Sequence, residues 1–125
     1  ALMGNRFLEL LETMPEVEVY LMNTGRVGGT DDDERSKKVK IPHSSAMVKG
    51  IVEGSIEWRE DPDFGYFIAT NVPGFDDADL LRPIEMYERQ GRMDEYNEIV
   101  KALKAERREY ILTFPGLDQS IIEAL

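Results

Sequence analysis

The stretch Val17-Glu18-Val19-Tyr20-Leu21-Met22, followed by Asn23-Thr24-Gly25, decides which fold the sequence predicts. Polar and apolar residues alternate at its start and an apolar run ends it, which is typical of a β-strand with one partly exposed end and one buried end. The predicted strand leads into a glycine-rich loop that begins at Gly25. Because ligands of α/β proteins bind where strands end in such loops, we expect a functional site within residues 17–54.

Further elements are predicted on both sides of this strand. Apolar residues at helical spacing predict a helix over Asn5–Met14, which Pro15 ends. After the loop, Val39–Ile41 is predicted to be a short β-segment that Pro42 stops. A serine at position 44 or 45 is then expected to cap a helix that ends at Gly54. One face of that helix is expected to carry Met47, Val48, Ile51 and Val52.

The second half of the chain predicts one more strand and several helices. Phe64–Thr70 has the aromatic and β-branched content of a strand. A helical region follows Arg82-Pro83 and closes at Pro115-Gly116, and the tail Leu117–Leu125 is weakly helical. The order of strands and helices predicts the α/β class, with one mixed sheet and flanking helices. At 125 residues we expect a single unit over 1–125, with an α/β portion over 1–83 and a terminal helical portion over 84–125.

Charge and composition exclude several classes of function. A net charge of −10 argues against binding to nucleic acid or to an anionic membrane surface, because both require a basic surface. The absence of cysteine excludes disulfides and thiolate metal sites and fits a cytoplasmic location. No apolar run reaches the roughly 20 residues that span a bilayer, and the N-terminus does not resemble a signal peptide. The chain begins at Ala1 within an apolar pattern, so we expect a piece of a longer protein.

The motifs around the loop are incomplete as catalytic or metal sites. Gly25–Thr30 follows the predicted strand but lacks the Gly-Lys-Ser/Thr ending of a phosphate loop, so a plain flexible loop is expected. The acids Asp31–Glu34 do not have the spacing of a calcium loop, and such a run is usually solvated. His43, the only histidine, is expected to be structural at a helix start rather than a general base. We therefore predict no catalytic residue and no metal ligand.

The order and spacing of several motifs resemble ATP-dependent phosphoenolpyruvate carboxykinases. These motifs are Tyr20–Gly25, a glycine-containing loop, Lys38–Ile41, the helix that runs into Gly54-Ser55, and Leu80-Leu81-Arg82-Pro83. The resemblance covers roughly residues 1–83 by motif. It implies that the chain is the C-terminal part of the family's mononucleotide-binding domain.

The resemblance also implies an activity and three site residues. The parent enzyme would convert oxaloacetate and ATP to phosphoenolpyruvate, carbon dioxide and ADP, a lyase reaction of gluconeogenesis that uses Mg²⁺ and often Mn²⁺. Counting back from Gly54-Ser55, the family's adenine-contacting arginine, the apolar residue after it and a threonine at the helix start fall on Lys38, Val39 and Ser44. Lys38 departs from the family's arginine, whose guanidinium plane stacks on a base better than an ammonium group does.

Two hypotheses about function follow. In the first, the chain supplies adenine-side contacts in a carboxykinase-like parent, its partners are the missing N-terminal portion and a nucleotide, and it is inactive alone. Phosphoryl transfer needs phosphate-binding and metal-binding groups, which this hypothesis assigns to the rest of the parent. In the alternative, the chain is a small non-catalytic protein-interaction domain. The first hypothesis predicts a contiguous apolar surface, with Lys38 and Ser44 on the rim of a shallow groove.

Overall fold

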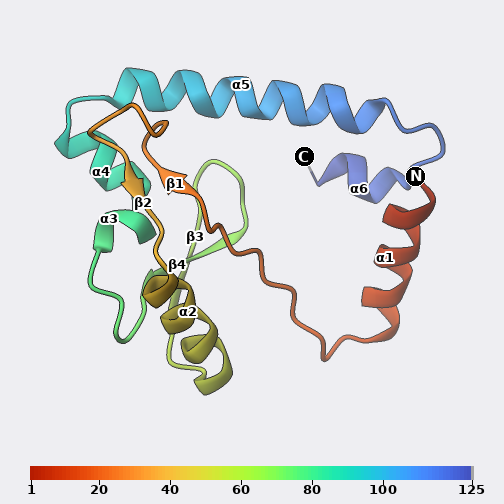
Figure 1. The fold of residues 1–125 in the computed structure, drawn as a ribbon. Helices are drawn as coiled ribbons and strands as arrows, with labels where there is room; N and C mark the ends of the chain where they lie inside the picture. Colours follow the sequence, from red (N-terminus) through yellow and green to blue (C-terminus); the bar gives the residue numbers. More distant parts are fainter. Residues whose placement is uncertain (125) are drawn as a thin grey trace. The chain divides into compact units, whose positions relative to one another are not determined.

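The computed structural model describes residues 1–124, whose helices and strands are labelled in Figure 1. In chain order the elements are α1 (Leu2–Thr13), β1 (Arg26–Val27), β2 (Lys37–Lys38), α2 (Ile41–Glu53), β3 (Glu57–Glu60), β4 (Phe67–Asn71), α3 (Ala78–Leu81), α4 (Pro83–Arg89), α5 (Met93–Leu112) and α6 (Gln119–Glu123). The chain divides into two compact units. Met22–Tyr96 forms one unit, and Ala1–Leu21 together with the chain from Asn97 onward forms the other.

The strands form two separate antiparallel pairs, β1 with β2 and β3 with β4. Arg26 lies opposite Lys38 in the first pair, and Trp58 lies opposite Ala69 in the second. The predicted mixture of helices and strands is therefore confirmed, whereas the predicted single mixed sheet is wrong. Each pair is a hairpin between neighbouring segments. β3 was missed in the sequence because all four of its residues are exposed, so it has no alternation of buried and exposed positions.

The predicted strand Val17–Met22 is wrong. This stretch has no regular secondary structure and belongs to neither sheet of the described residues. Its side chains are exposed, and Leu21 reaches 96% exposure. Alternating side chains indicate that a segment suits a pleated, half-buried surface, but a strand also needs neighbours for its backbone hydrogen bonds. Within each hairpin the two strands pair only with each other, so residues 17–22 find no strand to pair with among the described residues.

α2 begins earlier than the sequence predicted. The predicted cap was Ser44 or the serine after it, whereas the helix starts at Ile41 with Lys40 as the N-cap residue. Pro42 lies in the first turn, where its missing N–H removes no helical hydrogen bond and its fixed φ suits the helix. The predicted end is confirmed, because Gly54 adopts φ 62° and ψ 29°, the left-handed conformation that terminates a helix.

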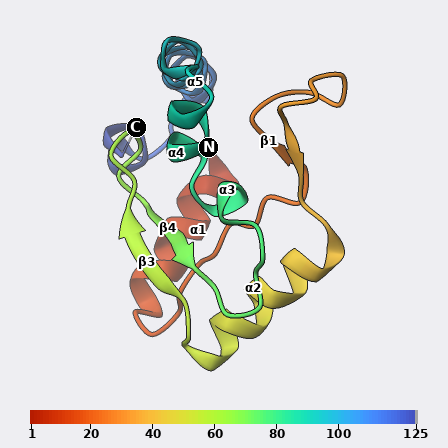
Figure 2. The same cartoon turned by 90° about the vertical axis from the view of Figure 1, so that its left-hand side faces the viewer.

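The inner face of α2 packs on a small core beside β4 (Figure 2). The buried members of this core are Ile56, Ala69 and Val72. Half-buried residues that pack against them are Ala46, Met47, Ile51, Phe75 and Leu81. Gly50 permits a close approach of the helix, because a Cβ there would meet Ile56 Cγ1 at 2.8 Å and Val72 Cγ1 at 3.4 Å. The position of α2 therefore depends on the absence of a side chain at residue 50.

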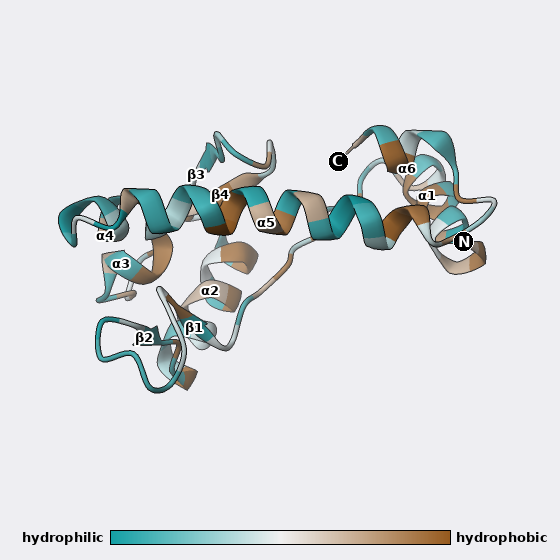
Figure 3. Cartoon of the chain, turned by 90° about the horizontal axis from the view of Figure 1, so that it is seen from above, coloured by the Kyte–Doolittle hydropathy of each residue, from teal (hydrophilic) through white to brown (hydrophobic). Residues whose placement is uncertain are grey.

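The helices predicted before Val17 and after Pro83 are confirmed. In the unit that holds α1 and α6, Asn5 Nδ2 donates to the Gly116 carbonyl oxygen at 2.9 Å, and Asn5 Oδ1 accepts from the Asp118 backbone N–H at 2.9 Å. Figure 3 shows that α5 is largely hydrophilic, with scattered hydrophobic bands. None of the helices within residues 1–124 has both the length and the apolar character that crossing a bilayer requires.

Replacing Gly50 by valine is expected to destabilise the Met22–Tyr96 unit by about 1–3 kcal/mol, because the added atoms overlap a filled core. The matched control is Lys49→Val, which places the same side chain on the exposed side of α2. Chemical denaturation followed by the fluorescence of Trp58, the only tryptophan, measures both variants. Equal stability of the two variants would contradict the close packing of α2.

Candidate functional site

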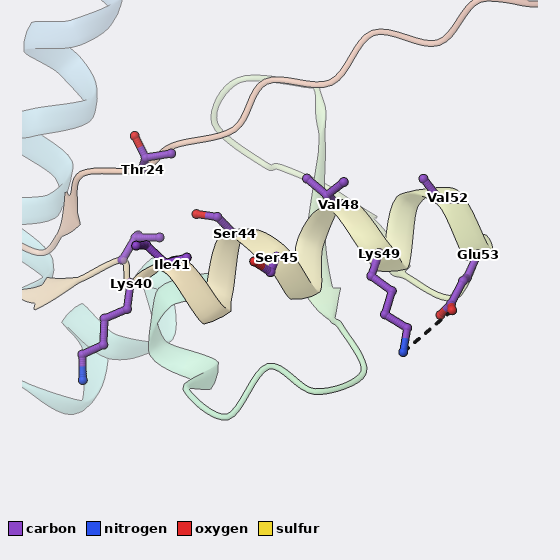
Figure 4. A pocket seen from close by; sticks show the side chains of 10 residues that line it. Thr24, Lys40, Ile41, Ser44, Ser45, Val48, Lys49, Val52 and Glu53 are labelled. Carbon is purple, nitrogen blue, oxygen red and sulfur yellow. Dashed lines mark ion pairs between the residues drawn. The ribbon is translucent and has the colours of Figure 1, made fainter.

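An open groove of about 650 Å³ runs along α2 (Figure 4). Val39 and Ser44, two of the three residues predicted to contact a nucleotide, line this groove. The other lining residues are Thr24, Lys40, Ile41, Ser45, Val48, Lys49, Val52 and Glu53. Thr24 comes from the extended segment before β1, so the groove lies between that segment and the outer side of α2.

The groove is apolar because α2 carries apolar side chains on two sides. Ile41 and Val52 are each 82% exposed, and Val48 is 51% exposed. The sequence placed Val48 and Val52 on one face with Met47 and Ile51, but only Met47 and Ile51 pack against the core. The sequence did hold a signal for this groove, since a helix with apolar residues beyond its core-facing stripe has a second apolar surface.

A second hollow, of about 430 Å³, adjoins the groove at the start of α2, because Lys40 lines both. Lys38, the third predicted residue, lines this hollow and not the groove. The other residues that line it are Lys37, His43, Asp76 and Asp77. The structure therefore brings Val39 and Ser44 together and places Lys38 in a neighbouring charged hollow.

His43 joins the start of α2 to the segment after β4. Its Nδ1 accepts a hydrogen bond from the Lys40 backbone N–H at 3.1 Å, so its proton lies on Nε2, which donates to Asp76 Oδ1 at 3.1 Å. The ring is buried and stacks on Phe75, with 4.7 Å between the ring centroids. Both ring nitrogens are engaged, so His43 connects the start of α2 to the segment that holds Phe75 and Asp76.

Lys37 forms ion pairs at the edge of the charged hollow. Its Nζ lies 2.9 Å from Asp77 Oδ1 and 2.7 Å from Asp79 Oδ2, at the start of α3. Hydrogen bonds with Asp79 and Asp77 raise the pKa of Lys37, and the Lys37 ammonium lowers the pKa of Asp79. Within residues 1–124, neither Lys38 nor Lys40 forms an ion pair with an acid. These two exposed ammonium groups therefore share the hollow with the carboxylates of Asp76 and Asp77, so its lining carries both signs of charge.

The glycine-rich segment between Gly25 and Lys38 is a loop whose base is closed by the short β1–β2 pair, so the predicted loop is confirmed for residues 28–36, while its flexibility stays a prediction. Ser36 is buried inside it. The Ser36 Oγ accepts from Arg26 Nε at 2.9 Å and lies 2.7 Å from the Thr30 carbonyl oxygen, to which it donates. No local pattern predicts this closure, because it depends on side-chain hydrogen bonds between residues six to ten positions apart.

The acids Asp31–Glu34 are partly paired within this hairpin. Asp31 lies 3.0 Å from Arg26 Nη1, and Asp33 lies 2.7 Å from Arg35 Nη2. The hydrogen bonds from Arg35 lower the pKa of Asp33. Among the described residues, no group of three or more His, Asp or Glu side chains is arranged to hold a metal ion.

The groove and the charged hollow both lie within the part of the chain that matches a known family. A family model described as Phosphoenolpyruvate carboxykinase matches residues 3–78. The curated relatives include proteins named phosphoenolpyruvate carboxykinase (ATP) from Geobacillus kaustophilus, 31% identical over 107 residues, and from Bacillus subtilis, 33% identical over 104 residues. These alignments cover 82% and 81% of this chain, and 20% and 19% of the relatives. No solved structure matches the chain.

The chain thus shares most of its length with ATP-dependent carboxykinases. It belongs to the phosphoenolpyruvate carboxykinase family, as its motifs indicated. It spans about a fifth of the length of the curated relatives it matches. The groove and the charged hollow are therefore features of a carboxykinase segment.

The Lys37–Asp79 pair is expected to make stability depend on pH. Because the pKa of Asp79 is lowered in the folded chain, the pair stabilises the fold above the ordinary aspartate pKa, and this stabilisation is lost as pH falls through the lowered value. Lys37→Met should therefore cost on the order of 1 kcal/mol near neutral pH and progressively less below about pH 4. Thermal unfolding across this range measures the effect. Lys49→Met, which removes an exposed 3.8 Å pair with Glu53, is the control. The same loss at every pH would contradict this account.

Proposed function

We propose that the chain, as a single segment over residues 1–125, is the C-terminal part of an ATP-dependent phosphoenolpyruvate carboxykinase-like parent and forms the adenine side of its nucleotide site. The parent reaction would convert oxaloacetate and ATP to phosphoenolpyruvate, carbon dioxide and ADP in the cytoplasm. The observation that carries this proposal is the placement of Val39 and Ser44 in one groove, with Lys38 in the adjoining hollow. Family membership also supports it, since the three residues are those that the family pattern indicates.

The chemistry of the groove suits a nucleoside. An adenine ring has two apolar faces and a polar edge, and sites for such ligands combine apolar walls with a few placed polar groups. Val39, Ile41 and Val48 supply apolar surface, and the Ser44 hydroxyl both donates and accepts hydrogen bonds. The ammonium groups of Lys38 and Lys40 lie in the adjoining hollow, where they suit the negative charge of a nucleotide.

The proposal assigns catalysis to the remainder of the parent. Phosphoryl transfer depends on groups that cradle the phosphates and on metal ions that neutralise charge. The described residues do not fit a divalent metal, because they contain no suitable cluster of His, Asp or Glu. The phosphates of ATP and the Mg²⁺ or Mn²⁺ ion would therefore be held mainly by residues outside this chain, whereas the groove would hold the base.

The exposed apolar side of α2 favours contact with a further part of the parent protein. Ile41, Val48 and Val52 are exposed and line the same groove, which agrees with the apolar surface that the carboxykinase hypothesis predicts. In the proposal, the missing N-terminal portion of the parent covers the part of this surface that the nucleotide leaves open. The same exposed surface also favours the alternative function, a small interaction domain that binds a protein partner and no nucleotide.

Amide chemical shifts of the chain, titrated with MgATP, adenosine and Mg²⁺-tripolyphosphate, distinguish the two functions. MgATP and adenosine should both shift the amides of Val39, Lys40 and Ser44, because the groove is proposed to recognise the base. Tripolyphosphate should shift only the amides of Lys38 and Lys40 in the charged hollow. Shifts at Val39 and Ser44 with tripolyphosphate alone, or no shift with any of the three ligands, would contradict the adenine-side proposal.

Ser44→Ala is expected to weaken ATP binding by roughly five-fold, about the effect of one lost hydrogen bond. Its stability should change by less than about 0.5 kcal/mol, because Ser44 lies inside α2 and is not its cap. Ser45→Ala, which removes the neighbouring hydroxyl on the same groove, is the matched control and should bind ATP as the wild type does. Equal effects of the two variants on ATP affinity would mean that the Ser44 hydroxyl makes no specific contact with ATP.

A further inference from the structure

Arg92, which lies between α4 and α5, is a buried charge that the proposed function does not use. Its exposed fraction is 6%. Its Nη2 donates to the Gly28 carbonyl oxygen at 3.0 Å and to Glu95 Oε1 at 2.5 Å, and its Nη1 donates to Gln90 Oε1 at 2.7 Å. Its guanidinium also lies over the Tyr87 ring, 4.6 Å from the centroid. A buried charge is costly unless its donors are hydrogen-bonded, and these contacts supply acceptors to both terminal nitrogens of the Arg92 guanidinium.

These contacts attach the β1–β2 hairpin to the α4–α5 corner. Gly28 follows β1 directly, and a Cβ on it would meet Met86 Cε at 2.3 Å, so the hairpin backbone rests on a side chain of α4. On the other side of the hairpin loop, two residues before β2, the Arg35 carbonyl oxygen accepts a hydrogen bond from Gln90 Nε2 at 3.3 Å. The Arg92 guanidinium bridges the two parts, because it bonds Gly28 and also holds Gln90.

The two ends of the hairpin lead directly into residues that line the groove. Thr24 precedes β1, Val39 follows β2, and both residues line the groove. The base of the hairpin is closed next to them by a hydrogen bond from the Val39 backbone N–H to the Gly25 carbonyl oxygen at 2.9 Å. A movement of the hairpin relative to α4 and α5 would therefore change the separation of Thr24 and Val39 from the helix α2.

We propose that Arg92 is a positioning residue for the nucleotide groove. It fixes the β1–β2 hairpin through Gly28 and thereby sets the places of Val39 and Thr24, although it contacts no ligand itself. Lysine cannot replace it, because a single ammonium group lacks the planar fork that reaches Gly28, Gln90 and Glu95 at once. The part of this inference that concerns a nucleotide rests on the proposed function. The part that concerns the hairpin does not.

The test uses Arg92→Met in the 125-residue chain, with hydrogen exchange read at single amides. The Val39 amide, which closes the base of the hairpin, should exchange about ten-fold faster than in the wild type, while the amide of Ile51 in the core-facing side of α2 keeps its rate. Arg92→Lys, which keeps the charge, should give an intermediate rate at Val39. Arg6→Met, which removes an exposed arginine paired with Glu9, is the control and should change neither amide.

ATP affinity supplies the second readout. Arg92→Met should weaken MgATP binding, measured by the shift of the Ser44 amide, by at least about three-fold, because the walls of the groove are no longer held. An unchanged Val39 exchange rate would overturn the inference. Equal acceleration at Val39 and Ile51 would also overturn it, because Arg92 would then only stabilise the fold. Failure of the wild type itself to bind ATP would instead overturn the proposed function, and the exchange rates would still decide whether Arg92 positions the hairpin.

Discussion

The close contact of Gly50 with Ile56 and Val72 is the constraint on which the rest of the site depends. A helix that approaches its core this closely has one permitted rotation about its axis, because interiors are packed too densely to accept another. That rotation turns Met47 and Ile51 inward and leaves the opposite side of α2 to form the groove. The position of the site is therefore a consequence of core packing and does not depend on any ligand.

The start of α2 is fixed by a different set of interactions. His43 bonds the Lys40 backbone N–H on one side and Asp76 on the other, and its ring lies on Phe75. These contacts satisfy a backbone donor at the helix start in place of the serine cap that the sequence predicted. Because they hold the first turn, the Ser44 side chain is free of a capping role and can face the groove.

Local sequence signals predicted the ends of helices better than the pairing of strands. Pro15 and Gly54 mark helix ends because their effects on the backbone are local. The stretch Val17–Met22 has the side chains of a strand, but its pattern carries no information about a hydrogen-bonding neighbour, and the two hairpins pair within themselves. The β-segment predicted at Val39–Ile41 is wrong, because Pro42 lies in the first turn of α2, which accepts proline as well as the end of a strand does.

The candidate site was partly predictable from the family resemblance. Family resemblance selects Val39 and Ser44, and both line the groove. The helical pattern instead groups Val48 and Val52 with the core-facing Met47 and Ile51, and Ile41 falls in the predicted β-segment, so the exposed apolar side of α2 is not predicted. The anchoring of the hairpin by Arg92 depends on a contact between residues 64 positions apart, which no local pattern contains. The chain thus combines a groove set by local helix packing with a hairpin set by long-range polar contacts.

The ATP affinity of a chimera shows whether the groove along α2 holds the adenine of a bound nucleotide. In this chimera, the chain replaces the stretch that it matches in the Geobacillus kaustophilus relative, so that the remaining four-fifths of a carboxykinase is supplied. The account predicts that the folded chimera binds ATP and that Val39→Asp within it removes binding, because a carboxylate would enter the apolar wall of the adenine groove. A folded chimera that does not bind ATP, or one whose binding survives Val39→Asp, would contradict the account.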